Sequence, residues 1–435
     1  MLSSLCSPRL CGKQIFPRLW GNAWVLIPLL FLVALTLRVL YILQGHAVPP
    51  LDTPDYDGIA RNLLQGRGFI VRGLQAWRPP LYPAFLAGIY GLFGYHHLPV
   101  KLLQALIGAW MVPVLYWMGR EIEGEGIGKI GATLVALYGP LISKANEVMT
   151  ETVFTFLLAV MGLLLIRGMR RGGYRNEVGG GIVLGLAVLT RPVLLGFIFV
   201  LPILGLLWRR VRMVKKMGIA SCCALVVVLP WTVRNYMVFR AFVPVSTMGG
   251  FVFSRSNSFW PDWKQERAWG VTAAFAEEIP SEIERDRYWW REGRRFIRSH
   301  PGFYLRLVGE KFLRFWYVFH PRYNFWFGTI APFAFLGMVW NVRRERWWPL
   351  YGLILFSLGM FTLVFYGCAR FRLPLEPFLI LFAASSFYGL FRRCPSTRMP
   401  YVLVASVAGL NGALYVASGP IREALVGLLR AWGLK

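Results

Sequence analysis

The chain has 435 residues, of which 56% are hydrophobic and only 16% are charged, and its mean hydropathy is +0.50. A soluble domain averages about 45–50% apolar and about 25% charged residues, so this composition excludes an ordinary soluble enzyme. A formal net charge of +27 could indicate nucleic-acid binding, but the cations lie in short runs between long apolar segments. That distribution is typical of the cytoplasmic loops of a polytopic membrane protein, so no nucleic-acid partner is expected.

Apolar segments recur along the whole chain, and eleven of them are candidates for crossing a bilayer. They are residues 23–43, 100–119, 128–144, 150–167, 179–192, 193–208, 217–235, 324–341, 349–367, 373–391 and 400–418. We therefore expect an all-α polytopic integral membrane protein with about eleven transmembrane helices, ten to thirteen being compatible with the pattern. The apolar segment 81–94 has only about 14 residues, which favours an interfacial or re-entrant helix.

The orientation follows from the basic connectors between these segments. The most basic connectors are residues 167–175, 209–216, 343–346 and 392–398. If the N-terminus is cytoplasmic, as Arg9, Lys13 and Arg18 suggest, alternation of the spans places every one of these connectors inside. The expected location is the plasma (inner) membrane, with two sizeable loops on the outer face.

This topology divides the chain into five parts. They are a cytoplasmic segment 1–22, a transmembrane catalytic module 23–235 with an outer loop 44–99, an outer-face region 236–323, C-terminal transmembrane helices 324–418 and a tail 419–435. The second half of the outer-face region, from Ile279 to Phe319, has the pattern of an amphipathic helix interrupted at His300-Pro301.

Three carboxylates follow the first apolar segment within six residues, in a chain with only 21 acidic residues. They are Asp52, Asp55 and Asp57. An uncompensated carboxylate near hydrocarbon costs several kcal/mol, so an acidic cluster at a helix exit suggests a catalytic or ion-binding site. The alternative is a solvated loop with a turn at Pro54-Asp55.

Arginines gather at the same predicted face. Arg191, Arg234, Arg370 and Arg372 lie at outer ends of three separate spans, and Arg78 is held by the stiff run Pro79-Pro80-Leu81-Tyr82-Pro83. Guanidinium groups offer a planar fork of donors to a phosphate. Each arginine singly could snorkel to lipid headgroups, but jointly they favour an anion site. Arg38, late in the first span, is expected to snorkel.

Two further carboxylates are placed at the outer start of the fourth span. Glu147 and Glu151 are four residues apart, on one face if the segment is helical. Because like charges so placed repel, at least one should have a cationic partner, and Lys144 and Arg191 are the nearest candidates. Helix capping with nearby acids is the alternative interpretation.

Motifs for cofactors are missing from the sequence. The five histidines lack zinc-ligand spacing, and there is no P-loop or dinucleotide glycine fingerprint. No cofactor is required by the sequence, a divalent cation could take part, and no metal ligands are assigned.

Six motifs in order resemble the polytopic glycosyltransferases of the GT-C fold, in particular the family-39-like, ArnT-like and protein-mannosyltransferase-like group. They are Asp52-x-x-x-Tyr56-x-x-x-Ala60-x-Asn62-Leu63-Leu64-x-Gly66-x-Gly68-Phe69, Arg78-Pro79-Pro80-Leu81-Tyr82-Pro83, Asn146-x-x-x-Thr150-Glu151, Gly185-Leu186-Ala187-x-Leu189-Thr190-Arg191-Pro192, Pro230-Trp231-Thr232-x-Arg234-Asn235-Tyr236 and Arg370-Phe371-Arg372-Leu373-Pro374-x-Glu376-Pro377. Each motif is weak alone, whereas all six in order are specific.

The resemblance implies an enzyme that takes a sugar from a polyprenyl-phosphate donor on the outer face, with inversion at the anomeric carbon. It maps the catalytic base onto Asp52, although Thr53 stands where the family often has a second acid. The substrate-binding residues expected with it are Asp55, Tyr56, Arg78, Tyr82, Lys144, Glu147, Glu151, Arg191, Arg234, Arg370 and Arg372. Membrane lipid and an acceptor glycan, lipid or protein are the other expected partners.

A transporter or flippase of lipid-linked glycans is the alternative function. Such proteins usually carry polar residues and broken helices near the bilayer midplane, whereas here the notable charges gather at one face. A lipid-linked oligosaccharide transferase is a second alternative within catalysis.

Overall fold

The structure is a computed structural model that describes residues 21–45, 52–207, 211–259, 279–316, 324–393 and 399–431. Within these ranges the chain is helical, apart from loops and one isolated bridge between Val71 and Leu74. The helices are α2 (Ala23–Leu43), α3 (Thr53–Leu64), α4 (Leu81–Phe93), α5 (His97–Ala109), α6 (Met111–Ile122), α7 (Glu125–Leu137), α8 (Gly139–Ser143), α9 (Glu151–Arg170), α10 (Arg175–Thr190), α11 (Leu195–Leu207), α12 (Val211–Phe239), α13 (Gly249–Ser256), α15 (Glu282–Ser299), α16 (Pro301–Trp316), α17 (Phe325–Asn341), α18 (Trp348–Gly359), α19 (Ala369–Arg372), α20 (Glu376–Arg393), α21 (Met399–Val416) and α22 (Ser418–Ala431).

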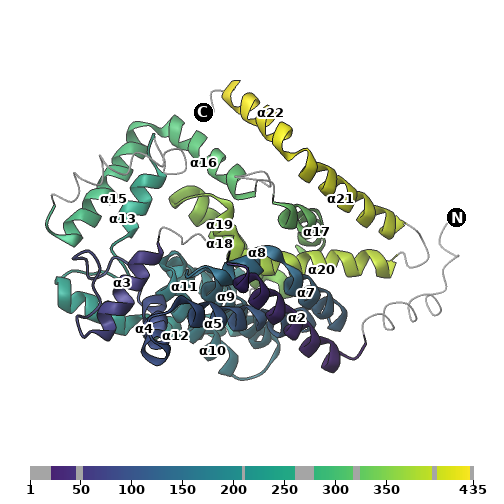
Figure 1. The fold of residues 1–435 in the computed structure, drawn as a ribbon, viewed down its shortest axis with the longest axis horizontal. Helices are drawn as coiled ribbons and strands as arrows, with labels where there is room; N and C mark the ends of the chain where they lie inside the picture. The colour runs from purple at the N-terminus through teal and green to yellow at the C-terminus, as the bar shows by residue number, and fades with distance from the viewer. Residues whose placement is uncertain are drawn as a thin grey trace.

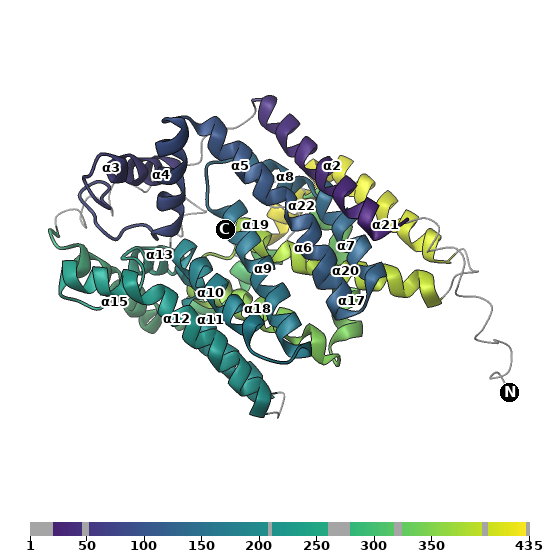
Figure 2. The same ribbon diagram turned by 90° about the horizontal axis from the view of Figure 1, so that it is seen from below.

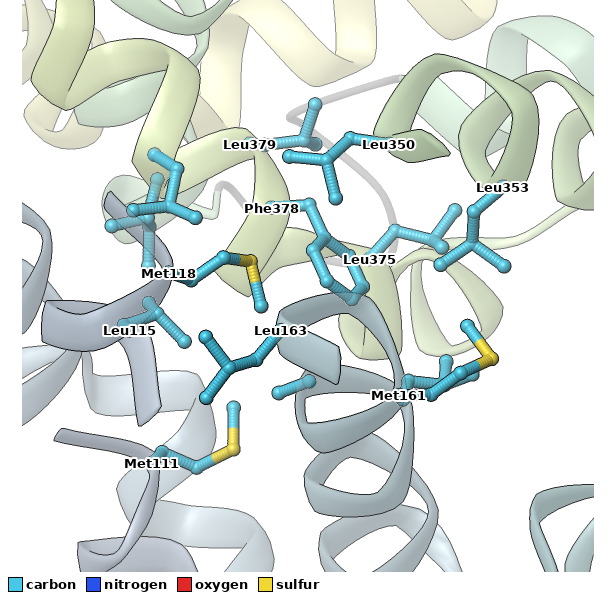
Figure 3. Close-up of a cluster of buried hydrophobic side chains, with 14 of the residues drawn as sticks. Met111, Leu115, Met118, Met161, Leu163, Leu350, Leu353, Leu375, Phe378 and Leu379 are labelled. Carbon is cyan, nitrogen blue, oxygen red and sulfur yellow. The ribbon is translucent and has the colours of Figure 1, made fainter. Parts of the chain in front are cut away.

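The centre of the bundle is a continuous apolar core to which α6, α9, α18 and α20 contribute. Figure 3 shows Met118 of α6 and Leu163 of α9 beside Phe378 of α20, with Leu350 of α18 close by. Each of these four side chains is buried. The core is therefore built from segments that are far apart in the sequence, so the N-terminal and C-terminal helices form one body.

Small residues let the helices of this body approach closely. A Cβ on Gly181 or Gly185 of α10 would lie 2.2 Å or 2.8 Å from a backbone oxygen of α12. On α6, a Cβ at Gly119 would meet the backbone of Gly128 in α7 at 2.8 Å. Close backbone approach at small residues is typical of helix packing in membranes, where apolar burial alone does not drive association.

Two clusters of charged residues lie at opposite ends of α9. At one end Glu151 pairs with Arg191 and Arg370. At the other end Arg167 and Arg170 pair with Glu121. Because α9 spans 20 residues at 1.5 Å per residue, the clusters are about 28 Å apart, close to the thickness of a bilayer's hydrocarbon core.

Helix length and hydropathy support membrane insertion without confirming the number of spans. Among the described residues, six helical segments are long and apolar enough to cross a membrane, and a bent pair, Glu125–Leu137 with Gly139–Asn146, would make a seventh. Four shorter apolar helices add to these: Leu81–Phe93, Pro192–Leu206, Phe325–Asn341 and Tyr401–Val416. The expected all-α membrane architecture is confirmed, whereas the count of eleven is not.

The loops expected to be large contain helices of their own. The first holds α3 and α4, which lie side by side, and the second holds α13, α15 and α16 (Figures 1 and 2). The predicted break at His300-Pro301 is correct, since α15 ends at Ser299 and α16 begins at Pro301. The segment assigned to a C-terminal tail contains α22, which continues the line of α21 in Figure 1.

Candidate active site

Asp52 directly precedes the first turn of α3. Proline at the start of the helix, Pro54, fixes a backbone dihedral that suits a helical N-terminus. The Asp52 side chain makes no capping hydrogen bond, so its carboxylate is directed to other partners. Oδ1 accepts from Arg78 Nη2 at 2.8 Å and Oδ2 accepts from Arg370 Nη2 at 3.2 Å. The side chain is 28% exposed, and Asp52 thus lies between two arginines with an open side.

Arg78 is the more buried of these two arginines. Its side chain is 8% exposed, and it donates from Nε and Nη2 to Asp55 Oδ2 at 3.1 Å and 2.7 Å. The other oxygen of Asp55 pairs with Arg72 at 2.9 Å. The guanidinium also lies 5.2 Å from the ring centre of Tyr56. Asp55 therefore fixes Arg78, and one donor of Arg78 remains for Asp52.

Arg370 connects Asp52 to a second buried carboxylate. Its Nε donates to Glu151 Oε1 at 2.6 Å, and Arg191 Nη2 lies 2.8 Å from the same oxygen. Arg191 also donates from Nε to Thr150 Oγ1 at 2.9 Å. Glu151 is 1% exposed, whereas the Arg370 side chain is 39% exposed. Glu151 thus orients Arg191 and Arg370, and Arg370 also pairs with the accessible carboxylate of Asp52.

The arginines keep Asp52 ionised. Burial alone raises the pKa of the Asp52 carboxyl, but the charges of Arg78 and Arg370 and their hydrogen bonds outweigh that effect. The resulting pKa is below the ordinary value for aspartate. Among the described residues, no group of three or more His, Cys, Asp or Glu side chains is placed to hold a metal ion. Participation of a divalent cation stays a prediction.

Tyr56, Tyr82 and Lys144 lie next to the charged residues around Asp52. Tyr56 and Tyr82 pack edge to face at 5.1 Å, and the Tyr82 hydroxyl donates to Gln104 at 2.9 Å. The Gln104 amide donates in turn to the backbone oxygen of Glu147 at 2.7 Å. As expected from their positions, Lys144 pairs with Glu147 at 2.7 Å and Arg191 pairs with Glu151.

One expectation for these glutamates is wrong. Glu147 and Glu151 do not share a helix face, because Glu147 is extended and α9 begins only at Glu151. Residues 147–150 form bends and a turn between the last turn of the preceding segment and α9. The two carboxylates are therefore kept apart, each with its own cation.

Two of the predicted arginines are not part of the cluster. Arg372 is fully buried, pairs with Glu376 at 2.9 Å and donates to the backbone oxygen of Phe315 at 2.6 Å. Arg234 donates to the backbone oxygen of Gln75 at 2.8 Å and so supports the loop that leads to Arg78. Both residues hold the structure around the site, and within the described residues neither pairs with the carboxylates of Asp52 or Glu151.

The third acid of the opening cluster also has a different place. Asp57 faces away from Asp52 and accepts hydrogen bonds from Tyr90 at 2.6 Å and Tyr95 at 3.3 Å. His97 Nε2 lies 2.8 Å from the same carboxylate. Asp57 therefore joins α3 to α4 and α5.

Arg38 does not snorkel as expected. Its side chain is fully buried against Gly108 of α5 and donates to the backbone oxygen of Ala34 at 2.9 Å. Nε and Nη2 have no hydrogen-bond partner among the described residues. The side chain lines a cavity of about 10 Å³ together with Lys144 and Glu151. Arg38 is buried because α2 packs against α5, so that the side of α2 that carries Arg38 faces the protein interior.

Glu282 is the main residue that the sequence did not single out. Its carboxylate accepts from the backbone N–H groups of Gln75 at 2.7 Å and Ala76 at 3.1 Å, and from the Thr247 hydroxyl. It therefore fastens the start of α15 to the loop two residues before Arg78. The only sequence signal was its place among the acids of the outer-face region, more than 200 residues from its partners.

Comparison with known proteins gives a match to one family model over part of the chain and a similar fold. Residues 77–233 match the model of the dolichyl-phosphate-mannose-protein mannosyltransferase family. A search of curated protein sequences found no match.

Solved structures of two membrane enzymes are similar in fold. ArnT from Cupriavidus metallidurans in the apo state is 17% identical, with a TM-score of 0.59 over 91% of this chain and 65% of that chain. The same ArnT bound to undecaprenyl phosphate is 14% identical, with a TM-score of 0.56 over 95% and 74%. The oligosaccharyltransferase AglB from Archaeoglobus fulgidus, in complex with an inhibitory peptide and a dolichol-phosphate, is 14% identical, with a TM-score of 0.55 over 91% and 55%.

These matches confirm the predicted resemblance to GT-C, ArnT-like and protein-mannosyltransferase-like proteins, and the chain is an integral membrane protein with that fold. The chain spans about 55% of the length of AglB, so the similarity covers only part of that enzyme. At 13–17% identity, the structural likeness concerns the fold alone.

Proposed function

We propose that the chain is a membrane glycosyltransferase that moves a sugar from a polyprenyl-phosphate donor to an acceptor hydroxyl. The observation that carries the proposal is Asp52, an accessible carboxylate held between Arg78 and Arg370 at one end of the helical bundle. The ArnT and AglB structures that resemble this fold contain undecaprenyl phosphate and dolichol-phosphate, which supports a lipid phosphate as the donor's leaving group.

Each group of the cluster has a role in this reaction. Asp52 takes the proton of the acceptor hydroxyl as its oxygen attacks the anomeric carbon. The bond from that carbon to the phosphate oxygen breaks, and the lipid phosphate leaves with one additional negative charge. Arg370 and Arg78 stabilise this charge more strongly in the transition state than in the bound donor. A single displacement inverts the anomeric configuration.

Donor binding changes the state of the base. In the ligand-free protein the two arginines lower the pKa of Asp52 and thereby make it a weak base. A lipid phosphate that accepts hydrogen bonds from Arg370 competes with Asp52 for that guanidinium. Asp52 then loses part of the stabilisation that the positive charge of Arg370 gives to its ionised form. Its pKa therefore rises only when a donor is present. This coupling would limit proton abstraction to the occupied site.

The proposal also includes the orientation of the chain in the membrane and the classes of donor and acceptor. The site faces the outer side of the plasma membrane, with the N-terminus and the basic cluster around Glu121 on the cytoplasmic side. The donor sugar is a hexose or a pentose, and the acceptor is a glycan, a lipid or a protein.

Release of free polyprenyl phosphate tests the reaction class. Native membranes with and without the overproduced chain, which supply acceptors, would receive radiolabelled polyprenyl-phosphate sugars, and release of lipid phosphate and movement of donor between leaflets would be followed in parallel. Donor-dependent release of lipid phosphate supports a transferase. Movement of intact donor between leaflets without release would instead establish the flippase alternative and overturn the proposal.

A further inference from the structure

Four arginines form a stripe along one side of α15. Arg287, Arg291, Arg294 and Arg298 are spaced by four, three and four residues. At 100° per residue these positions fall within an arc of about 60°. All four are exposed. Arg287 and Arg298 are eleven residues apart, so the stripe is about 16 Å long.

The opposite side of α15 is packed against α13. Trp289 is buried on this side and packs edge to face on Phe251 at 5.7 Å, and a Cβ on Gly293 would lie 2.6 Å from the Phe253 ring. The N–H group of Gly250 donates to Asp286 at 2.7 Å. The apolar side of the helix is therefore used within the protein, and the arginines point away from it.

Acids on α15 compensate this stripe only weakly. Glu282 accepts from the backbone around Gln75, Asp286 accepts from Gly250, and Glu292 pairs with Arg295, which lies beside the stripe. Glu284 is exposed and lies just before the stripe on the same side. Within the described chain, no ion pair is found for Arg291, Arg294 or Arg298.

The stripe starts close to the candidate active site. Glu282, one turn before Arg287, is bonded to the loop that ends in Arg78. Figures 1 and 2 show α15 at the end of the molecule where α3 lies, away from the end where α7 and α20 lie. A ligand on the stripe would therefore extend from the neighbourhood of Asp52 outward.

We propose that the arginine stripe of α15 binds a linear polyanion, a polymer with repeated carboxylate or phosphate groups, and presents it to the site as the acceptor. Repeated anions match a row of cations with about 16 Å of length, and the guanidinium fork binds either group bidentately. A membrane surface fits less well, because an interfacial helix inserts its apolar face into lipid, and here that face is covered by α13. The acceptor half of this inference rests on the proposed function, whereas the binding half does not.

Polyanion binding by the purified full chain in neutral detergent tests the inference. The probes are end-labelled polyphosphate and end-labelled polygalacturonate, with neutral dextran as the blank, at low and at physiological salt. The stripe variant replaces Arg287, Arg291, Arg294 and Arg298 by Gln. The matched control replaces four exposed basic residues of other helices and connectors, Arg175, Arg212, Lys215 and Arg343, by Gln, and so removes the same charge.

We expect wild type to bind at least one anionic probe in a salt-dependent manner and dextran not at all. The stripe variant should lose about tenfold or more of that affinity and the control variant less than about twofold, since each exposed ion pair contributes modestly. The probe that binds better tells a phosphate polymer from a uronate polymer. A stripe variant with Lys at all four positions should bind more tightly than the Gln variant, because it keeps the charge, and less tightly than wild type, because it lacks the guanidinium fork.

Three results would overturn the inference. The first is an equal loss of polyanion affinity in the stripe and control variants. The second is no binding of either polyanion by wild type. The third is a stripe variant that binds polyanions like wild type but no longer binds phosphatidylglycerol vesicles. Asp52→Asn separates the two proposals, because it should bind the polyanion like wild type. If wild type releases no lipid phosphate from the donor but the stripe still binds polyanions, the proposed function and the acceptor role are both wrong, whereas polyanion binding by the stripe stands.

Discussion

The carboxylate of Asp52 is controlled by charges that arrive from two distant parts of the chain. Arg78 lies 26 residues away and Arg370 lies 318 residues away. Each arginine is itself held by a more buried acid, Asp55 or Glu151. Asp55 and Glu151 fix the positions of the two arginines, and each arginine also pairs with Asp52. Of these three carboxylates, only Asp52 is substantially exposed.

Arg370→Gln should move the acidic limb of the pH–rate profile toward neutral pH. Asp52 has a pKa below its ordinary value, partly because of Arg370, and the proposed reaction needs its ionised form. Without Arg370 its pKa rises, so activity is lost at a higher pH as the solution is acidified. Turnover at neutral pH should also fall, because a contact to the leaving phosphate is removed, by about 10- to 1000-fold.

The matched control is Arg67→Gln, an exposed arginine of the same loop region. Its pH profile and turnover should equal those of wild type. An unshifted acidic limb in Arg370→Gln, at any level of turnover, would show that Arg370 does not tune the base.

Residue types alone indicated which acids and arginines to consider, but not which of them meet. Arg370 and Arg372 are two residues apart in the same motif, yet one reaches Asp52 and the other pairs with Glu376 inside the protein. The short helix α19 turns them to different sides. Asp57 likewise belongs to the predicted acidic cluster but is bound by Tyr90 and His97. Such partners depend on packing between segments, which spacing in the sequence does not contain.

At the scale of helices, the contact between α2 and α5 brings a charge into the protein. Arg38 is fully buried, and Gly108 leaves the space for it: a Cβ there would lie 2.7 Å from Arg38 Nε. Arg38 lines the same small cavity as Lys144 and Glu151, so this contact lies directly behind the candidate active site.

Gly108→Ala should destabilise the protein by about 1–3 kcal/mol, because the added methyl group overpacks a site whose guanidinium is fixed by the Ala34 carbonyl. The measurement is thermal unfolding in detergent. Gly218→Ala in α12 is the control, since its Cβ would meet nothing within 4 Å and alanine favours the helix. Equal stability of both variants would mean that Arg38 can leave the contact freely.

The contact between α13 and α15 should weaken as the pH rises through about 6. Burial raises the pKa of Asp286 to about 6, although the Gly250 N–H group and Trp290 oppose the shift. A carboxyl whose pKa is raised in the folded state contributes stability that is fully present below its unfolded pKa and is lost as the pH rises through its folded pKa. Hydrogen exchange of α13 and α15 should therefore be slower at pH 5 than at pH 7.5, after correction for intrinsic rates.

Asp286→Asn should abolish this difference, because the amide keeps an acceptor for Gly250 and carries no charge. A difference of equal size in Asp286→Asn would show that Asp286 is not the source of the pH effect.

At the scale of the whole molecule, the bundle separates two charged ends by an apolar core. The end opposite the site is fixed by a buried pair, Lys216 with Glu177, in which both side chains are almost fully buried. Lys216 also donates to the backbone oxygen of Arg171 at 2.8 Å. This arrangement joins α9, α10 and α12 at the end away from Asp52.

Lys216→Met should destabilise the protein by about 3–5 kcal/mol, because it leaves the Glu177 carboxylate buried and unpaired. Lys215→Met, at the adjacent and exposed position, should change stability little. The midpoint of thermal unfolding in detergent checks both. A Lys216→Met protein as stable as wild type would show that this ion pair does not stabilise the contact between α10 and α12.

The fold was more predictable than the site. Long apolar segments reveal most membrane helices, because the bilayer demands length and apolarity over a continuous stretch. The segment 81–94 was likewise expected to be too short to cross, and α4 has 13 residues. The exact number of spans was not predictable, since several helices are short or contain a bend such as that of 54° after Leu137. The contact of Glu282 with Gln75 could not be foreseen, since it joins residues 207 apart across two loops.

The central claim is that Asp52 abstracts the acceptor proton while the arginines bind the donor phosphate. The most direct test compares wild type with Asp52→Asn in two quantities, the turnover of a radiolabelled polyprenyl-phosphate sugar and the affinity for that donor. The account predicts that Asp52→Asn loses turnover by about 10²- to 10⁴-fold, as expected for a missing general base, and binds the donor at least as tightly, since both arginines remain. Equal turnover in the two proteins, with normal expression of both, would contradict it.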